Sequence, residues 1–107
     1  MLSAATLLIL LSSCTPKPTI KVPAEFQAGQ NYFHKACASC HGVDALGKQT
    51  RAPGLIDSEY LPENFSDEEM RKQIIEGSEK MRSQRNKVSD IEIEEIIKYL
   101  RYSQKAA

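Results

Sequence analysis

Three chemically reactive side chains, those of Cys37, Cys40 and His41, fall within five positions and constrain this chain more than any other feature. Two residues separate the cysteines, and the histidine follows the second cysteine directly. Side chains of these types hold zinc, exchange disulfides or attach a haem, and each chemistry requires a different fold around the cluster. The surrounding sequence therefore has to distinguish three kinds of site.

Zinc and disulfide exchange both fit the cluster poorly. A structural zinc site needs four ligands, whereas the cluster offers three, and the adjacent side chains of Cys40 and His41 seldom reach one tetrahedral ion together. His34 is the only other histidine, and the sequence has no second Cys-x-x-Cys pair. A thioredoxin-like pair opens a helix after a strand, whereas this pair follows a predicted helix.

The hydrophobic periodicity predicts an all-α domain with three main helices. The first helix is expected over residues 24–36. The second runs from a capping box at Ser66 to a stop at Gly77, and the third begins at a capping box at Ser89. No segment alternates convincingly at period two, so no sheet is expected. The side chains expected to face the core are Phe26, Phe33, Met70, Ile74, Ile93, Ile96, Ile97 and Leu100.

A long segment without a predicted element, residues 42–65, directly follows the cluster. An unstructured loop of that length is uncommon in a compact small domain unless something organises it. The chain also has no Trp and only seven aromatic residues in 107, and so small a domain often needs a cofactor, metal or disulfide for stability. Both observations indicate a large ligand around which the loop wraps.

The pattern Cys-x-x-Cys-His is the attachment signature of c-type haem. The two thiols add to the two vinyl groups of a porphyrin, and cysteines three positions apart on a helical turn lie on one face. His41 then binds the iron as the proximal ligand, and its other ring nitrogen is expected to donate to a backbone carbonyl. The motif therefore predicts one haem c, covalently bound through Cys37 and Cys40.

Three side chains are candidates for the sixth iron ligand. Met70 lies on the inward face of a predicted helix, where methionine usually fills the core. His34 lies on the helix before the attachment site, where a surface or capping role is expected. Met81 lies in the polar loop GSEKMRSQRNKVS, where packing does not explain a methionine. Met81 is therefore the predicted axial ligand, and thioether ligation opposite histidine raises the reduction potential and suits electron transfer.

Residues 24–102 resemble the class I c-type cytochromes in the order of their parts. AGQNYFHKACASCHG is similar to the family's N-terminal helix and haem site, and FSDEEMRKQIIEG is similar to its middle helix. MRSQRNKVSDIEIEEIIKYLR is similar to the ligand loop and C-terminal helix, which places Met81 at the axial position. The resemblance implies a cytochrome c fold, with three main helices and long loops around one covalently bound haem, and a single-electron carrier rather than an enzyme.

The resemblance also implies roles for residues outside the motif. RAPGL is similar to the family's proline-containing loop, so the carbonyl of Pro53 is expected to accept the proton of His41. Gly29 and Phe33 are expected to meet Tyr99 where the first and last helices cross, with glycine allowing close approach.

Two positions depart from the family pattern. Arg82 stands where the family usually has a proline directly after the ligand methionine, and Gln84 replaces a hydrophobic residue. Without the rigid proline, we expect a looser Met81 loop and a more easily broken iron–sulfur bond.

The charge is balanced overall but uneven locally. Fourteen Lys and Arg offset fourteen Asp and Glu, which gives no indication of nucleic-acid binding. Arg51 and Tyr60 in the long loop are candidates for hydrogen bonds to haem propionates. A basic cluster around Met81 is expected to steer an acidic redox partner, with an ordinary solvated loop as the alternative. The cluster consists of Lys80, Arg82, Arg85 and Lys87.

The N-terminus resembles a bacterial lipoprotein signal. Leu2 to Leu11 is almost wholly apolar but only half as long as a membrane-spanning helix, and LSSC is similar to a lipobox, although no Lys or Arg precedes it. The expected organisation is a signal peptide at 1–13, a lipidated proline-rich tether at 14–23 that begins at Cys14, and a cytochrome c domain at 24–107. A lipid at Cys14 would anchor the protein to the periplasmic side of a membrane.

Two alternative functions stay open on the sequence. A haem domain with a labile sixth ligand could sense a small gas or act as a weak peroxidase. The same fold could also serve as the cytochrome subunit of a larger oxidoreductase.

Overall fold

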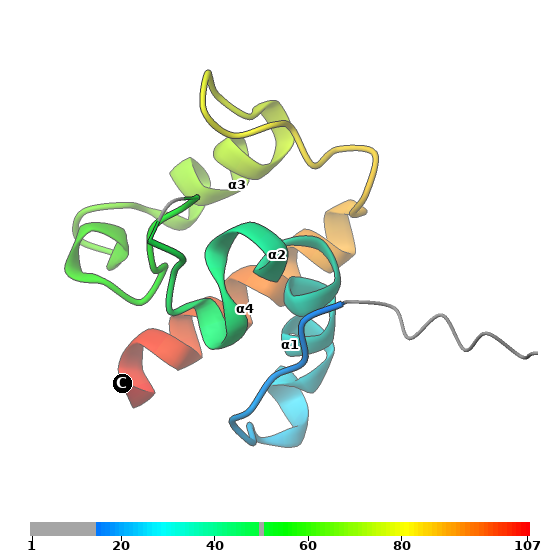
Figure 1. Cartoon of the computed structure of the whole chain (residues 1–107), viewed down its shortest axis with the longest axis vertical. Coiled ribbons are helices and arrows are strands. Elements are labelled where there is room, and N and C mark those ends of the chain that lie inside the picture. The colour runs from blue at the N-terminus through cyan, green and yellow to red at the C-terminus, as the bar shows by residue number, and fades with distance from the viewer. Residues whose placement is uncertain (1–14, 50) are drawn as a thin grey trace, which may run out of the picture.

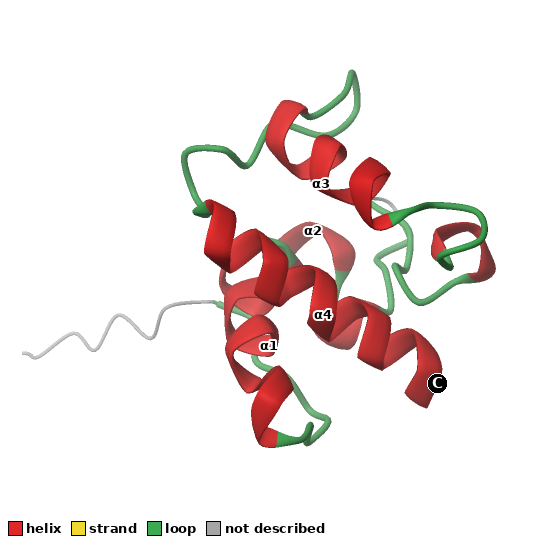
Figure 2. Cartoon of the chain, turned by 180° about the vertical axis from the view of Figure 1, so that it is seen from behind, coloured by secondary structure: helices red, strands yellow, loops and turns green. Residues whose placement is uncertain are grey.

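The computed structural model describes residues 15–49 and 51–107, and within them the chain is helical (Figures 1 and 2). The described part contains no strand, and its one isolated bridge pairs Lys48 with Ala52. The elements in chain order are α1 (Ala24–Ala36), α2 (Ala38–His41), η1 (Val43–Ala45), η2 (Ser58–Tyr60), α3 (Asp67–Glu76) and α4 (Asp90–Ala106). The prediction of an all-α fold is confirmed. The predicted signal peptide and Cys14 lie outside the described residues.

Local sequence signals mark both ends of α3 and the start of α4. The predicted bounds of α1 and α3 and the predicted start of α4 are confirmed. In front of α3, the Ser66 hydroxyl accepts from the backbone N–H of Glu69 at 3.1 Å, and the Glu69 carboxylate accepts from the N–H of Ser66 at 3.2 Å. Ser89 and Glu92 form the same reciprocal pair in front of α4. Gly77 ends α3 with a positive φ of 70°.

Helices α1 and α4 cross at close range and form the centre of the fold (Figure 2). A Cβ built on Gly29 would lie 2.0 Å from the carbonyl oxygen of Glu95, so only glycine allows this approach. The rings of Phe33 and Tyr99 pack beside the crossing with centroids 5.7 Å apart. The expected meeting of Gly29, Phe33 and Tyr99 is therefore confirmed.

The core gathers around this crossing and extends to α3. The largest fully buried side chains are Tyr99, Phe33, Ile93, Ile96 and Leu100. Met70 and Ile74 bring the inward face of α3 onto the same core, and Met70 is thus a core side chain, as expected. Apolar burial of this kind is the main favourable term in folding.

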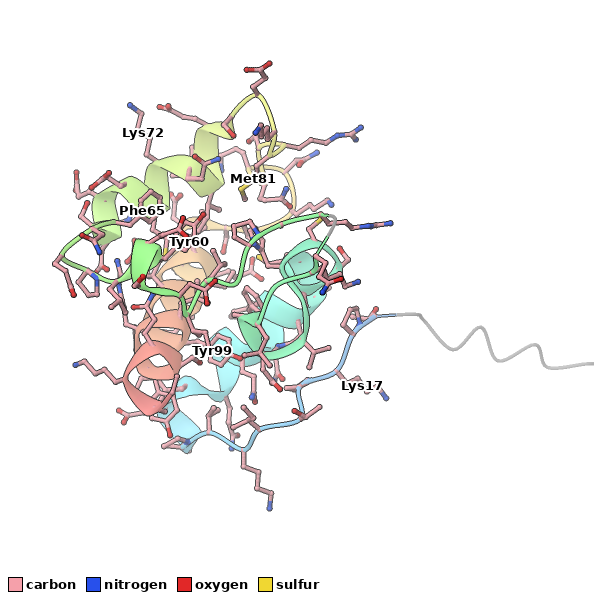
Figure 3. The ribbon with its side chains drawn as sticks, turned by 60° about the vertical axis from the view of Figure 1, so that its left-hand side comes forward. Lys17, Tyr60, Phe65, Lys72, Met81 and Tyr99 are labelled. Atoms are coloured by element: carbon pink, nitrogen blue, oxygen red, sulfur yellow. The ribbon has the colours of Figure 1, made fainter. Side chains whose placement is uncertain are left out.

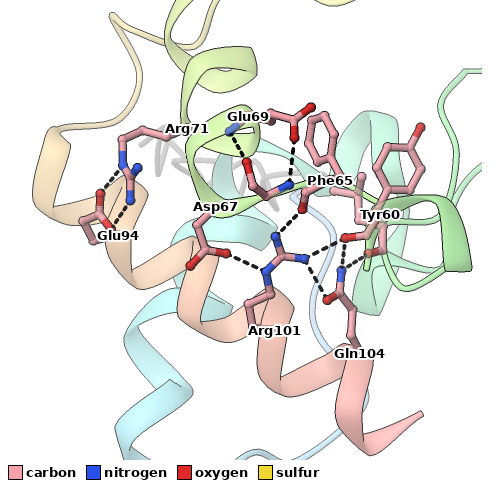
Figure 4. Close-up of polar contacts among 10 residues, drawn as sticks. Tyr60, Phe65, Asp67, Glu69, Arg71, Glu94, Arg101 and Gln104 are labelled. Carbon is pink, nitrogen blue, oxygen red and sulfur yellow. Dashed lines mark hydrogen bonds and ion pairs between the residues drawn. The ribbon is translucent and has the colours of Figure 1, made fainter. Parts of the chain in front are cut away.

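Side chains of α4 hold the long loop against the domain (Figure 4). Arg101 donates to the carbonyls of Tyr60 (2.6 Å) and Phe65 (2.5 Å) and pairs with Asp67 at 2.7 Å. Gln104 donates to the carbonyls of Leu55 (2.9 Å) and Tyr60 (2.8 Å). These contacts tie the loop to α4, in addition to the backbone hydrogen bonds that the loop forms within itself.

The expectation of no helix over residues 42–65 is wrong in detail. The segment contains η1 and η2, each of three residues. Elements of one turn are too short to show hydrophobic periodicity, which needs a window of eleven residues or more.

The N-terminal strap, Thr19–Val22, lies on the domain. Val22 is buried, and the side-chain amide of Gln30 on α1 donates to the carbonyl of Ile20 at 2.7 Å. Thr19 binds Asp44 through its backbone N–H (3.2 Å) and its hydroxyl. The chain expected to form an extended tether is therefore in contact with the domain from Thr19 onwards.

Candidate functional site

The Cys-x-x-Cys-His cluster forms a single turn between α1 and the long loop. Cys37 leaves the α1 geometry, and α2 then runs to His41, where Gly42 ends it at a φ of 85°. The backbone N–H groups of Cys40 and His41 both donate to the carbonyl of Cys37, at 3.2 and 2.9 Å. Both thiols are free, that of Cys40 exposed and that of Cys37 half-buried.

Burial changes the chemistry of Cys37. Desolvation first, and the neighbouring Cys40 second, raise the pKa of the Cys37 thiol to about 12, while Lys87 opposes the shift. Cys37 therefore stays protonated near neutral pH, because its surroundings disfavour a thiolate. An uncharged sulfur such as that of a thioether suits this environment.

The ring of His41 is oriented by the long loop. Its Nδ1 donates to the carbonyl oxygen of Pro53 at 3.0 Å, which is the contact that the resemblance implies. Because a carbonyl can only accept, the proton is on Nδ1, and Nε2 carries a lone pair. No residue in the described part of the chain hydrogen-bonds to Nε2, so this nitrogen is available to a metal.

Two glycines shape the loop that presents Pro53. Gly47 has a φ of 90°, and a Cβ on it would lie 2.6 Å from the backbone nitrogen of Gly54. The N–H of Gly47 also donates to the carbonyl of His41 at 2.6 Å. The loop thereby folds back on the turn that carries the imidazole.

Met81 lies in the loop after α3 (Figure 3), and its sulfur accepts a hydrogen bond. The side-chain amide of Gln73 on α3 donates to the Met81 sulfur at 3.5 Å. The backbone of Met81 is held as well, because its carbonyl accepts from the N–H of Ser78 at 2.7 Å. The thioether is half-buried rather than free in solvent.

The Met81 loop, which we expect to be looser without a proline at position 82, has polar contacts to α3. The N–H of Gln84 donates to the carbonyl of Ile74 at 2.8 Å, and the hydroxyl of Ser83 donates to the carbonyl of Ile75. Both acceptors are carbonyls at the end of α3, which lack partners within the helix. The loop thus has two polar attachments to α3 immediately after Arg82.

His34 is neither an iron ligand nor the surface or capping histidine that we expected. It is 3% exposed, its Nδ1 donates to the carbonyl of Gln30 at 2.7 Å, and its Nε2 accepts from the N–H of Asp44 at 3.0 Å. Both ring nitrogens are occupied, so no lone pair remains for a metal. The sequence does contain one signal for the burial of His34, because His34 is next to the core residue Phe33 on α1, the helix that meets α4.

The two propionate candidates occupy different environments. Arg51 is exposed and borders an open hollow of about 540 Å³ that is lined by residues 46–49 and 51–54. Tyr60 is half-buried, with its ring edge-on to Phe65 at 5.6 Å between centroids. Desolvation, with the charges of Glu59 and Asp57 beside it, raises the pKa of Tyr60, so its hydroxyl remains a donor.

The basic cluster has three charges without an acidic partner. Arg85 pairs with Asp90 at 2.7 Å, which removes one of the four predicted cations. Lys80, Arg82 and Lys87 are exposed and form no ion pair within the described residues. The positive charges of these three side chains are therefore not neutralised by a neighbouring acidic residue of the described chain.

The described residues offer no ligand set for a bare metal ion, since no three His, Cys, Asp or Glu side chains gather there. A haem brings four nitrogen ligands of its own, so it needs only one or two from the chain. None of the described helices is long and apolar enough to cross a membrane.

Comparison with known proteins gives the same family from sequence and structure. Residues 24–100 match the family model described as "Cytochrome C oxidase, cbb3-type, subunit III". No curated protein sequence matches the chain.

Three solved structures illustrate the shared fold. The c-type cytochrome XoxG from Methylobacterium extorquens AM1 is 25% identical, with a TM-score of 0.65 over 76% of this chain and 51% of that one. Cytochrome cL from Methylophaga aminisulfidivorans MPT is 32% identical, with a TM-score of 0.61 over 73% of this chain and 52% of that one. The chain therefore spans about half the length of each.

Cytochrome c6 from the diatom Phaeodactylum tricornutum shares the fold alone, at 22% identity and a TM-score of 0.59, over 76% of this chain and 95% of that one. The family implies covalently bound haem c and electron transfer. The chain belongs to the class I c-type cytochromes, in the group that the cbb3-type subunit III model describes.

Proposed function

We propose that this cytochrome carries single electrons on one haem c, which Cys37 and Cys40 attach and His41 and Met81 ligate. The observation that carries the proposal is the state of His41, whose Nδ1 donates to the Pro53 carbonyl at 3.0 Å. That tautomer leaves Nε2 as an electron-pair donor directly beside two free thiols.

The residues of the turn fit a covalently attached haem. Two thiols three positions apart on a helical turn can form thioethers with one porphyrin edge, and the burial of Cys37 favours an uncharged sulfur. When bound, haem c supplies an iron centre that accepts and releases one electron. The chain would hold the two sulfurs through Cys37 and Cys40 and orient the imidazole of His41 through the Pro53 carbonyl.

Met81 is the proposed second axial ligand. Its half-buried sulfur accepts from Gln73, and Ser78 binds its backbone. A thioether held in this way supports a stable sixth ligand and a raised reduction potential. A gas sensor or peroxidase instead needs a ligand that leaves readily, which the anchored loop disfavours.

An acidic redox partner is the proposed docking partner. Lys80, Arg82 and Lys87 have no ion pair among the described residues, and Lys87 is near enough to Cys37 to lower its pKa. The basic cluster therefore extends to the attachment turn, next to the proposed haem edge. We expect the electron-transfer rate to fall with rising ionic strength.

We also propose a lipid anchor at Cys14, after removal of residues 1–13, with the domain on the periplasmic side of a bacterial membrane. The apolar segment and LSSC support this assignment. The family supports the extracytoplasmic location alone, which is typical of c-type cytochromes.

A second candidate function is suggested by the description of the matching family, a subunit of an oxidase. The same haem domain could pass electrons within a larger oxidoreductase rather than shuttle freely. Purification from native membranes in mild detergent distinguishes the two, because a subunit stays with stoichiometric partners.

Mass spectrometry and redox titration of the native mature protein test the proposal. We expect the mass to show one bound haem and a diacylglyceryl modification at Cys14. The redox titration is expected to show a single one-electron transition. Haem that dissociates in acid, or that is retained after both Cys37→Ala and Cys40→Ala, would contradict covalent attachment at these cysteines.

A further inference from the structure

A polar network with two buried members, His34 and Asp44, links the N-terminal strap to α1 and to the turn after the haem-attachment motif. The carboxylate of Asp44 accepts from the backbone N–H of Thr19 at 3.2 Å and from its hydroxyl. The N–H of Asp44 donates to Nε2 of His34 at 3.0 Å. His34 and Asp44 are only 3% and 4% exposed, so the bond between them is buried. Thr19 itself is exposed, and its two bonds to Asp44 are partly buried.

The network holds a turn that L-residues rarely adopt. Asp44 and Ala45 have φ values of 58° and 61°, in the left-handed region where a Cβ is unfavourable. Aspartate tolerates this region better than most residues, whereas alanine does not. Two successive left-handed residues therefore need outside contacts, which Thr19 and His34 supply.

The left-handed turn at Asp44 and Ala45 supports the segment that orients His41. The carbonyl of Ala45 accepts from the N–H of Leu55 at 2.8 Å. Leu55 follows Pro53 by two residues, and the carbonyl of Pro53 accepts from Nδ1 of His41. A Cβ on the intervening Gly54 would lie 2.9 Å from the carbonyl of Leu46, so turn and segment are in close contact.

We propose that Thr19, His34 and Asp44 form a clasp that positions the proximal ligand His41. The inference rests on the proposed function, in which His41 binds the iron. Within the described residues, none of the three hydrogen-bonds to His41 or to the Pro53 carbonyl, so the clasp acts through the backbone of Ala45 and Leu55. The strap, expected to be part of a tether, thereby becomes part of the support of the site.

The clasp has a predictable electronic effect. A hydrogen bond from Nδ1 to a carbonyl makes the imidazole a stronger electron donor, which stabilises the oxidised metal. If the clasp opens, the turn can relax, the Pro53 carbonyl can move away, and the reduction potential rises. Loss of a methionine ligand has the opposite effect, because thioether ligation raises the potential.

Four variants of the haem-loaded protein test the clasp. Asp44→Ala removes both bonds to Thr19 and leaves alanine in a left-handed conformation, while Thr19→Val removes only the hydroxyl bond. Asp44→Asn keeps an acceptor and tolerates the turn, and serves as the conservative rescue. Thr15→Val is the matched control, because Thr15 is exposed and outside the network.

The readouts are the reduction potential and the NMR signals of the His41 ring. We expect an upward shift in potential for Asp44→Ala, a smaller one for Thr19→Val, and none for Thr15→Val, with Asp44→Asn near the wild type. Changes in the His41 ring signals are expected in the same order.

Lower thermal stability with unchanged potential and ring signals would reduce the clasp to a structural role and overturn the inference. A downward shift would overturn it as well. If Asp44→Ala does not load haem, the potential and ring signals of Thr19→Val alone decide whether the clasp positions His41. Failure of the proposed function is separate, because the wild type itself would then lack a low-spin histidine-ligated spectrum.

Discussion

The two sides of the proposed haem site are built by different means. On the proximal side, His41 lies on a helical turn and is oriented by a backbone carbonyl, that of Pro53. On the distal side, Met81 lies in a loop whose contacts include the side chains of Gln73, Ser78 and Ser83. Backbone contacts survive most substitutions, whereas side-chain contacts are lost with one. We therefore expect distal substitutions to change the sixth ligand while leaving haem attachment intact.

The proximal side should show the largest effect. His41→Ala removes the proposed strong ligand, and we expect haem that is poorly ligated, an unstable protein and little mature product. Absorption spectra and the yield of haem-loaded protein measure the loss. A normal low-spin spectrum in His41→Ala would contradict the assignment of this histidine.

Met81→Ala should be less severe, because the two thioethers and His41 still hold the haem. We expect loss of the sulfur-to-iron charge-transfer band, high-spin oxidised haem and a lower potential. Met70→Leu is the matched control, since it replaces a buried core methionine at nearly constant volume. A band that persists in Met81→Ala but disappears in Met70→Leu would show that Met70, and not Met81, is the iron ligand.

Gly77→Ala tests whether the end of α3 positions the distal loop. Gly77 has φ 70° and ψ −169°, and a Cβ there would lie 2.5 Å from the nitrogen of Ser83. Such a conformation is almost confined to glycine, so we expect a loss of about 2–3 kcal/mol in unfolding free energy. The charge-transfer band should weaken more than the haem content. Equal loss of both would show that the two sides are not independent.

Gln73→Leu removes the one polar contact that the Met81 sulfur makes within residues 15–49 and 51–107. A hydrogen bond of this kind contributes about 1 kcal/mol, so we expect imidazole to displace Met81 about fivefold more readily. Spectroscopic titration with imidazole measures the change. Lys72→Leu, on the same helix and exposed, is the control, and an equal effect there would exclude a specific role for Gln73.

Gln84→Met should have the smallest effect. The Oε1 atom of Gln84 is buried and has no hydrogen-bond partner among the described residues, although its amide nitrogen donates to the carbonyl of Arg82 at 2.9 Å. Removing an unsatisfied buried acceptor offsets the loss of that bond, so we expect a stability change within about 1 kcal/mol. Thermal unfolding measures it, and a loss above about 2 kcal/mol would show that the amide has a partner in the haem-loaded protein.

Local signals explain why the sequence predicts the main helices well. Capping boxes at Ser66 and Ser89 and the positive φ of Gly77 depend on neighbours within one or two turns. The haem-attachment motif is also local, because its residues lie on one turn. These local features were enough to predict the fold class, the family and the turn that bears the candidate site.

Contacts between segments that are far apart in the chain could not be predicted from the sequence. Arg101 and Gln104 bind carbonyls of residues some forty positions earlier, as the separations of 41 and 49 show. His34 bonds to the N–H of Asp44, whose carboxylate in turn binds Thr19, and no periodicity brings these three residues together. A histidine that looks exposed on its own helix becomes buried when a remote turn covers it.

The oxidised wild-type protein provides the most direct test of the central claim, that one haem c is ligated by His41 and Met81. Its absorption spectrum, recorded at neutral pH on the mature protein, reports the spin state and the sulfur ligand together. We predict a low-spin spectrum with a sulfur-to-iron charge-transfer band. A high-spin spectrum, or a low-spin spectrum without that band, would contradict His/Met ligation.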